Sequence, residues 1–265
     1  MAPSGGDSSR RAALFSALLL LAPRWATAQS AGAAGELFSF GANARGLAMG
    51  SAQTAAVNDV TALYYNPAGL GLLPGREVTL MRAKLFEGAT YDYIGYAQNK
   101  KKRAGGWGVE LVRLGAAGDD GRDESNNKTG GFSYAETALG IGHGWRGVFH
   151  PSMSIGVKGK LLRRSLGPSS DQTFGIDFGA QFGPIANERL SLGVVIQNAV
   201  ALGQGDTDDR LKPQIRAGAA FRVVGPMSVV ADLSQSGEIR VGTEYAFGMT
   251  SVRIGMADKS LSFGG

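Results

Sequence analysis

The sequence predicts an all-β protein, a transmembrane antiparallel β-barrel with a plug at its N-terminal side. The chain begins with a pattern typical of an export signal. From residue 76 onward, apolar side chains alternate with small or polar ones in about twelve units. Glycine stands at 41 of 265 positions, about twice its ordinary frequency, and no later run of 18 apolar residues predicts a transmembrane helix. The expected organisation is a signal peptide over residues 1–28, an N-terminal hatch or plug over 29–75 and a barrel over 76–265.

The first segment has the three parts of a signal peptide. Two arginines precede an apolar run over residues 12–22, which is too short to cross a bilayer, and a small-residue motif follows at 26–28. We expect cleavage before Gln29, and a short membrane anchor or a disordered tail is the alternative. An exported chain of this composition is expected in the bacterial outer membrane, in contact with its lipid, or in the periplasm as a soluble β-protein.

The strand units each have one apolar and one polar face. In the clearest unit, Phe174, Ile176 and Phe178 point one way, whereas Gly175 and Asp177 point the other. Many units reach about nine to eleven residues, the length of a tilted membrane-crossing strand, whereas strands of a soluble sandwich are commonly about five or six. The residues expected to face a polar lumen are Glu110, Lys158, Lys160, Asp177, Gln181, Arg216, Arg240 and Glu244. A sandwich core could not hold these charges cheaply, although a sandwich could turn them outward into water.

The connections and the aromatic residues give the expected orientation. With the N-terminus in the periplasm, the long polar connections at 115–130 and 199–212 lie outside, and shorter ones lie inside. Tyr91, Tyr93 and Tyr96 share one strand unit and are interpreted as residues of the membrane interface.

The segment before the strands is rich in glycine and alanine and fits neither a strand nor a continuous helix. Asn66 precedes a proline, which disfavours helical geometry there, and the small residues that follow allow close backbone approach. A short helix is expected within residues 52–65, with Asn58 or Asp59 as its N-cap. This composition suits a plug packed in a narrow lumen, and a periplasmic linker is the alternative. The candidate plug or gate residues are Gly46, Gly50, Asn58, Asp59, Tyr64, Asn66, Pro67, Ala68 and Gly69.

No pattern in the sequence predicts catalysis, a cofactor or a metal site. The chain has no cysteine, and its two histidines, His143 and His150, have no carboxylate at a metal-ligand spacing. The glycines around His143 are not followed by the helix that a dinucleotide-binding loop requires. Without residues 1–28 the chain has 24 basic and 21 acidic residues, and this formal charge of +3 is too small to predict a nucleic-acid partner.

Two motifs carry a family resemblance. They are GANARGLAMG at 41–50 and DVTALYYNPAGL at 59–70, and VIQN at 195–198 is a weaker third. In these residues the chain resembles the PorV/PorQ family, which is related to the FadL-type long-chain fatty-acid transporters. The resemblance extends over nearly the whole chain after the signal peptide.

The resemblance implies a fourteen-stranded outer-membrane barrel whose hatch contains the turn at Asn66, Pro67 and Ala68. The transporter branch implies passage of a hydrophobic small molecule, which leaves sideways through the wall. The PorV branch implies secreted-protein cargo and docking with secretion-machine components, and neither branch is enzymatic. Because about twelve strands are visible and the chain ends without a terminal aromatic residue, we expect a C-terminus truncated by about two strands.

The sequence therefore predicts a non-enzymatic barrel that handles hydrophobic or secreted-protein cargo at the outer membrane. An accessory barrel of a secretion machine, without transport of its own, and a soluble periplasmic β-protein are the two alternatives.

Overall fold

A computed structural model describes most of the chain after the predicted signal peptide, which lies outside the described residues. The described ranges are 35–85, 88–99, 105–122, 124–203, 211–223, 225–258 and 260–265. Four short helical elements come first: η1 Glu36–Ser39, α2 Ala44–Ala48, α3 Ala62–Tyr65 and η2 Pro67–Leu72.

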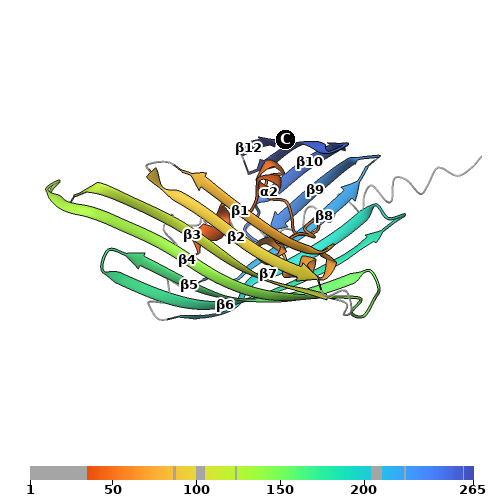
Figure 1. Cartoon of the computed structure of the whole chain (residues 1–265), viewed down its shortest axis with the longest axis horizontal. Helices are drawn as coiled ribbons and strands as arrows, with labels where there is room; N and C mark the ends of the chain where they lie inside the picture. The colour runs from red at the N-terminus through yellow and green to blue at the C-terminus, as the bar shows by residue number, and fades with distance from the viewer. Residues whose placement is uncertain are drawn as a thin grey trace, which may run out of the picture.

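Twelve strands follow the helical elements (Figure 1). They are β1 Arg76–Lys84, β2 Thr90–Asn99, β3 Gly105–Arg122, β4 Lys128–Arg146, β5 Met153–Leu166, β6 Ser169–Ile185, β7 Leu190–Gly203, β8 Gln214–Arg222, β9 Met227–Ser234, β10 Ile239–Phe247, β11 Thr250–Ala257 and β12 Ser260–Gly264. The prediction of about twelve antiparallel strands is confirmed.

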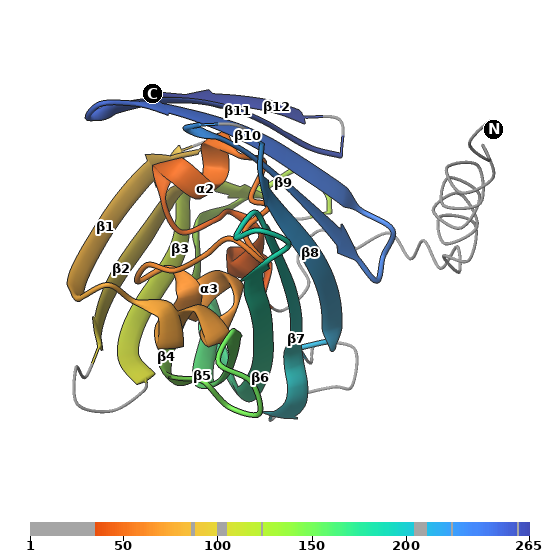
Figure 2. The same ribbon diagram turned by 90° about the vertical axis from the view of Figure 1, so that its right-hand side faces the viewer.

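All strands form one sheet in which each pairs with its neighbour in the sequence, in the order β1 to β12. The sheet curls so that its strands surround α2 and α3 (Figure 2). We call the space on the concave side the lumen. Among the described residues no pairing joins β1 to β12, so closure of the sheet into a barrel is not observed. The fourteen strands of the resembled family stay a prediction.

The two ends of the sheet differ. β3 and β4, with 18 and 19 residues, form a hairpin that projects beyond the other strands (left in Figure 1). We call this the hairpin end. The connections β4–β5, β6–β7, β8–β9 and β10–β11 lie at the opposite end, which we call the turn end.

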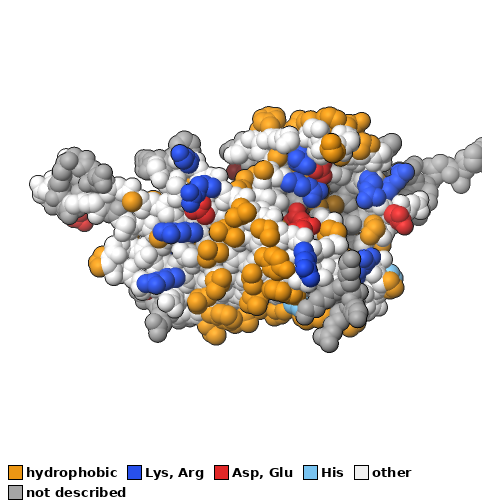
Figure 3. Space-filling model, in the orientation of Figure 1, with side chains coloured by type: hydrophobic (Ala, Val, Ile, Leu, Met, Phe, Trp, Pro, Cys, Tyr) orange, Lys and Arg blue, Asp and Glu red, His pale blue; other side chains and the backbone are white. Residues whose placement is uncertain are grey.

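The convex face of the sheet is apolar and exposed. Leu80 on β1 is 72% exposed, and Leu139 and Ile141 on β4 are 58% and 61% exposed. Hydrophobic side chains gather in a central band in Figure 3, with most lysines and arginines to its two sides. No helix in the described part of the chain is long and apolar enough to span a membrane. A continuous apolar outer face is the surface that a membrane-crossing strand presents to lipid.

Candidate functional site in the plugged lumen

Residues 35–75, which we call the plug segment, sit against a row of glycines on the concave face. Gly106, Gly144, Gly156 and Gly179 are consecutive partners across β3 to β6. A side chain on any of the four would collide with plug residues 66–71. The glycine excess noted in the sequence therefore has a structural reason in this row.

The glycine row continues on the later strands. Its members there are Gly193, Gly218, Gly242 and Gly255, at which an added Cβ would meet Thr54 or Met49. Close backbone approach is what glycine permits and every other residue prevents. The row lets a folded segment fill a narrow lumen with direct contact to the wall.

One prediction concerns this contact. Gly156→Ala places a methyl group against the backbone of Pro67, and we expect it to lower the free energy of unfolding by about 2 kcal/mol. The matched control is Gly159→Ala on the same strand, where a Cβ meets only the Phe174 ring at 3.7 Å. Urea unfolding in lipid vesicles measures both variants. Equal stability of the two variants would contradict the role of the row.

Asn66 fastens the plug segment to the wall, and its side chain is fully buried. Its Nδ2 donates to the Thr54 carbonyl at 2.7 Å and to the Ala180 and Val194 carbonyls of β6 and β7, both at 3.3 Å. Its Oδ1 accepts from the Ala68 N–H at 3.1 Å, which starts the 3-10 turn of η2 at Pro67. A single amide thus holds three backbone segments together.

Side chains of the wall also bond to the plug backbone. Asp232 Oδ2 on β9 accepts from the N–H and the hydroxyl of Thr54, at 3.0 and 2.7 Å. Gln181 Nε2 on β6 donates to the carbonyls of Thr54 and Val57, both at 3.1 Å. Gln197 Nε2 on β7 donates to the Tyr64 carbonyl at 3.1 Å. The glutamine amides thus satisfy buried plug carbonyls, and Asp232 satisfies the two donors of Thr54.

Helix α2 is held at the C-terminal strands by a charged pair. The Asn43 side chain caps the helix by accepting from the Gly46 N–H at 2.7 Å. Arg45 donates twice to Glu244 of β10, at 3.2 and 2.8 Å, and Arg253 of β11 donates to the same carboxylate at 2.6 Å. Burial acts to lower the pKa of Arg45, but the hydrogen bond and the charge of Glu244 outweigh it and raise that pKa.

A network of four buried charges lies on the wall of the lumen. Lys158 pairs with Glu110 and lies 3.7 Å from Asp177, and Lys160 pairs with Asp177 at 2.8 Å. All four are at most 2% exposed. Glu110 on β3 reaches Lys158 on β5 by passing over Gly140 of β4, where a Cβ would touch both side chains at 3.0 Å. The sequence predicted that these residues face a polar lumen, and the structure shows their charges buried and paired with one another across the wall.

An aromatic cluster is formed jointly by the plug segment and the wall, on the hairpin-end side of the glycine row. Its rings are Phe38, Phe40, Tyr64, Tyr91 and Tyr93, and Val112, Leu114, Ala138, Leu162 and Leu211 pack among them. Tyr64 and Tyr93 meet edge to face at 6.1 Å, and Phe40 lies 5.3 Å from Tyr91. Burial raises the pKa of the Tyr64 hydroxyl, so it stays protonated and donates to the Leu37 carbonyl at 3.3 Å.

Residues 35–40 enter this cluster from the N-terminal side. The Glu136 carboxylate, fully buried on β4, accepts from the N–H groups of Gly35 and Leu37, both at 3.2 Å. The Nζ atoms of Lys158 and Lys160 lie 5.2 and 4.4 Å from the centre of the Phe38 ring. The first described residues of the chain thus pack into the aromatic cluster beside three buried charged side chains.

Three details of the sequence analysis are wrong. The connection predicted over residues 115–130 is largely strand, because β3 extends to Arg122 and β4 begins at Lys128. The N-cap of α3 is Thr61 rather than Asn58 or Asp59, and Asp59 lies in the turn before it, where its Oδ1 accepts from the Thr61 N–H at 2.8 Å. Tyr91 and Tyr93 are not residues of the membrane interface. Both are fully buried and point into the lumen, which the alternation of β2 already favours.

The other candidate residues lie at several places in the lumen. Gly46 packs under the Tyr65 hydroxyl, and Gly50 lies at φ +61° against the backbone of Met256. Ala68 and Gly69 are buried in η2. Arg216 is 9% exposed, and Arg240 pairs with Glu238 at 2.8 Å, both apart from the four-charge network. Sequence reasoning missed Asp232 and Glu136, whose inward position on alternating strands was the available signal.

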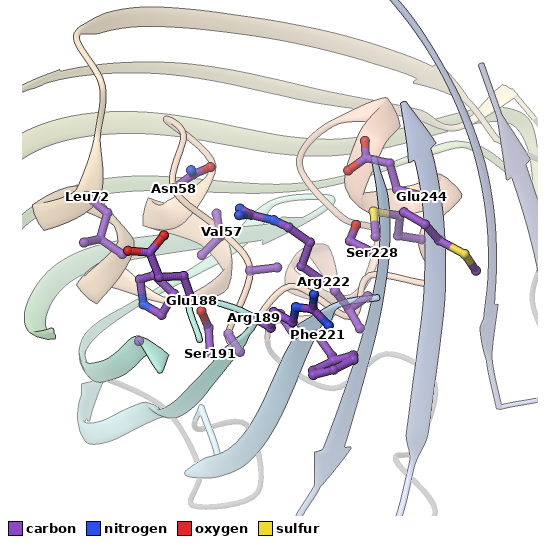
Figure 4. A pocket seen from close by; sticks show the side chains of 18 of the residues that line it. Val57, Asn58, Leu72, Glu188, Arg189, Ser191, Phe221, Arg222, Ser228 and Glu244 are labelled. Carbon is purple, nitrogen blue, oxygen red and sulfur yellow. The ribbon is translucent and has the colours of Figure 1, made fainter. Parts of the chain in front are cut away.

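A pocket of about 450 Å³ opens at the turn end (Figure 4). Plug residues, among them Met49, Val57, Asn58 and Leu72, line one side. The wall contributes a charged set, Arg146, Glu188, Arg189, Arg222 and Glu244. The plug segment therefore separates an apolar cluster from a charged pocket.

Comparison with known proteins gives the fold. No protein-family model matches the chain, and no curated protein matches its sequence. The TodX ΔS2S3 mutant, a monoaromatic hydrocarbon channel, superposes with a TM-score of 0.60 at 13% identity, over 84% of each chain. The Ralstonia pickettii toluene transporter TbuX gives 0.59 at 14% identity, over 84% of this chain and 88% of its own. The Pseudomonas putida toluene transporter TodX gives 0.55 at 12%, over 81% and 82%.

The chain shares the FadL-type barrel fold. At these identities the likeness extends to the fold alone. The resemblance to the PorV/PorQ family rests on the sequence motifs and stays a prediction.

Proposed function

We propose that the chain is a non-enzymatic channel of the bacterial outer membrane for small hydrophobic compounds, exported by a cleaved signal peptide. The observation that carries this proposal is the aromatic cluster, which holds residues 35–40 inside the lumen. Monoaromatic hydrocarbons are the favoured substrates, because their size and apolar surface match the Phe38 and Phe40 rings that they would replace. Solved channels of this fold include two toluene transporters, which supports the same class.

In this proposal the plug segment is the gate. Gly46, Gly50, Asn66 and the residues of η2 keep it seated, while residues 35–40 leave the cluster to admit substrate. The bonds from Gly35 and Leu37 to the Glu136 carboxylate oppose that release. Hydrogen bonds to a charged acceptor contribute about 1.5–3 kcal/mol each, so their loss shifts the equilibrium from the closed gate toward the open gate by a measurable amount.

Uptake of radiolabelled toluene by intact cells tests the proposal. We expect cells that express the chain to take up toluene faster than cells with an empty vector. Glu136→Ala should raise the rate further, by about threefold or more, because residues 35–40 lose the acceptor that holds them.

The matched control is Glu124→Ala, since Glu124 is an exposed residue next to the β3–β4 hairpin. It should leave uptake unchanged. An uptake rate equal to that of the vector, for a chain shown to be in the outer membrane, would overturn the channel. Recovery of the chain in the aqueous fraction without detergent would favour the soluble β-protein instead.

A role in protein secretion has the support of the sequence motifs only. Secreted-protein cargo and secretion-machine components are the partners that this role requires. Co-purification of such components with the chain from membranes is its test.

A further inference from the structure

The pocket at the turn end is separate from the aromatic cluster and has a different chemistry. Four arginines and two glutamates line it, a formal charge of +2. Of the two glutamates, Glu244 is already paired, because it accepts hydrogen bonds from Arg45 and from Arg253, a residue outside the pocket lining. Glu188 is thus the lining carboxylate, among the described residues, that has no ion pair, and it lines the same pocket as Arg146, Arg189 and Arg222.

Strand alternation places the three remaining arginines on the inward face. Arg146 and Arg222 are the last residues of β4 and β8, two positions beyond the inward residues Gly144 and Ala220. Arg189 lies two positions before the inward residue Ser191, just ahead of β7. The side chains of Arg189 and Arg222 border the pocket together with Val57 and Asn58 of the plug segment (Figure 4).

Arg189 and Arg222 are direct neighbours across two strands. Leu190 pairs with Phe221, and the Arg222 N–H donates to the Arg189 carbonyl at 2.8 Å, which continues the same register. Like charges directly opposite each other destabilise a sheet. Both side chains are exposed at the pocket, and within the described part of the chain neither guanidinium has an ion pair with a carboxylate, so both are available to an anion that enters the pocket.

We propose that this pocket binds a small aromatic carboxylate. A guanidinium group binds a carboxylate through two parallel hydrogen bonds, and we therefore infer that the ligand carries a carboxylate. Met49, Val57 and Leu72 of the plug segment supply an apolar wall for the rest of the molecule, and about 450 Å³ is a typical volume for a small-ligand site. This site goes beyond the proposed channel for neutral compounds and does not depend on it.

Binding of benzoate to the purified chain in detergent, followed by titration calorimetry, tests the proposal. We expect saturable binding to the wild type that weakens as sodium chloride is raised. The double variant Arg189→Gln with Arg222→Gln should bind benzoate about tenfold to a hundredfold more weakly. The Glu188→Gln variant should bind benzoate more tightly, because the substitution removes a carboxylate that repels the ligand. A misfolded protein could not give this result.

Two controls complete the experiment. Arg163→Gln changes an exposed arginine near the hairpin end of β5 and should bind benzoate like the wild type. Benzylamine, which has the same ring and the opposite charge, should not bind. Absence of saturable benzoate binding, equal affinity of the double variant, or equal binding of benzylamine would each overturn the proposal.

Discussion

Replacing Lys158 by methionine is expected to lower the free energy of unfolding by about 3–5 kcal/mol, the usual cost of breaking a buried ion pair. Lys158 is 1% exposed, and its ammonium group pairs with Glu110 and lies near Asp177. Asp177 keeps Lys160 in the variant, but Glu110 keeps only the hydroxyl of Tyr93, at 3.1 Å. The lost stability therefore comes from the Glu110 carboxylate, which is buried and cannot replace its lost partner with water.

A second substitution separates this cause from simple loss of packing. Glu110→Gln combined with Lys158→Met removes both charges, and we expect it to regain more than half of the lost stability. Lys212→Met changes an exposed lysine and should stay within about 0.5 kcal/mol of the wild type. Urea unfolding in phospholipid vesicles measures all three. If the double variant is no more stable than Lys158→Met, the network is not the source of the effect.

Much of the fold could be predicted from the alternation of apolar and polar residues along the sequence. Phe174, Ile176 and Phe178 of β6 were assigned to one face and Asp177 to the other, and the structure places them so. This works because the side-chain period of a strand is two, whatever its neighbours are. The same rule turns Tyr91 and Tyr93 inward, and the interface interpretation failed because it used residue type in place of position.

Contacts between distant strands could not be predicted in the same way. The pair Glu110 and Lys158 depends on the registers of β3, β4 and β5 and on Gly140 between them. The glycine row likewise needs Gly106, Gly144 and Gly156 in one line. A sequence alone shows that glycine is abundant, whereas the register decides which glycines meet the plug segment.

Asn66→Ala is expected to lower the free energy of unfolding by about 3 kcal/mol, because buried carbonyl groups lose their donor at about 1–3 kcal/mol each. The Thr54, Ala180 and Val194 carbonyls all face the Asn66 amide. Since two of these belong to the wall, the variant also weakens the hold on the plug segment. Single-channel conductance in planar bilayers should rise together with the loss of stability.

Two further variants sharpen this expectation. Asn66→Asp keeps the shape of the side chain and the acceptor for the Ala68 N–H, but it cannot donate to the three carbonyls and places a charge beside them. It should be at least as damaging as alanine, which a loss of volume alone would not explain. Asn58→Ala, at an exposed plug residue, should change neither stability nor conductance. A stable, non-conducting Asn66→Asp variant would mean that the glycine row, rather than this amide, seats the plug segment.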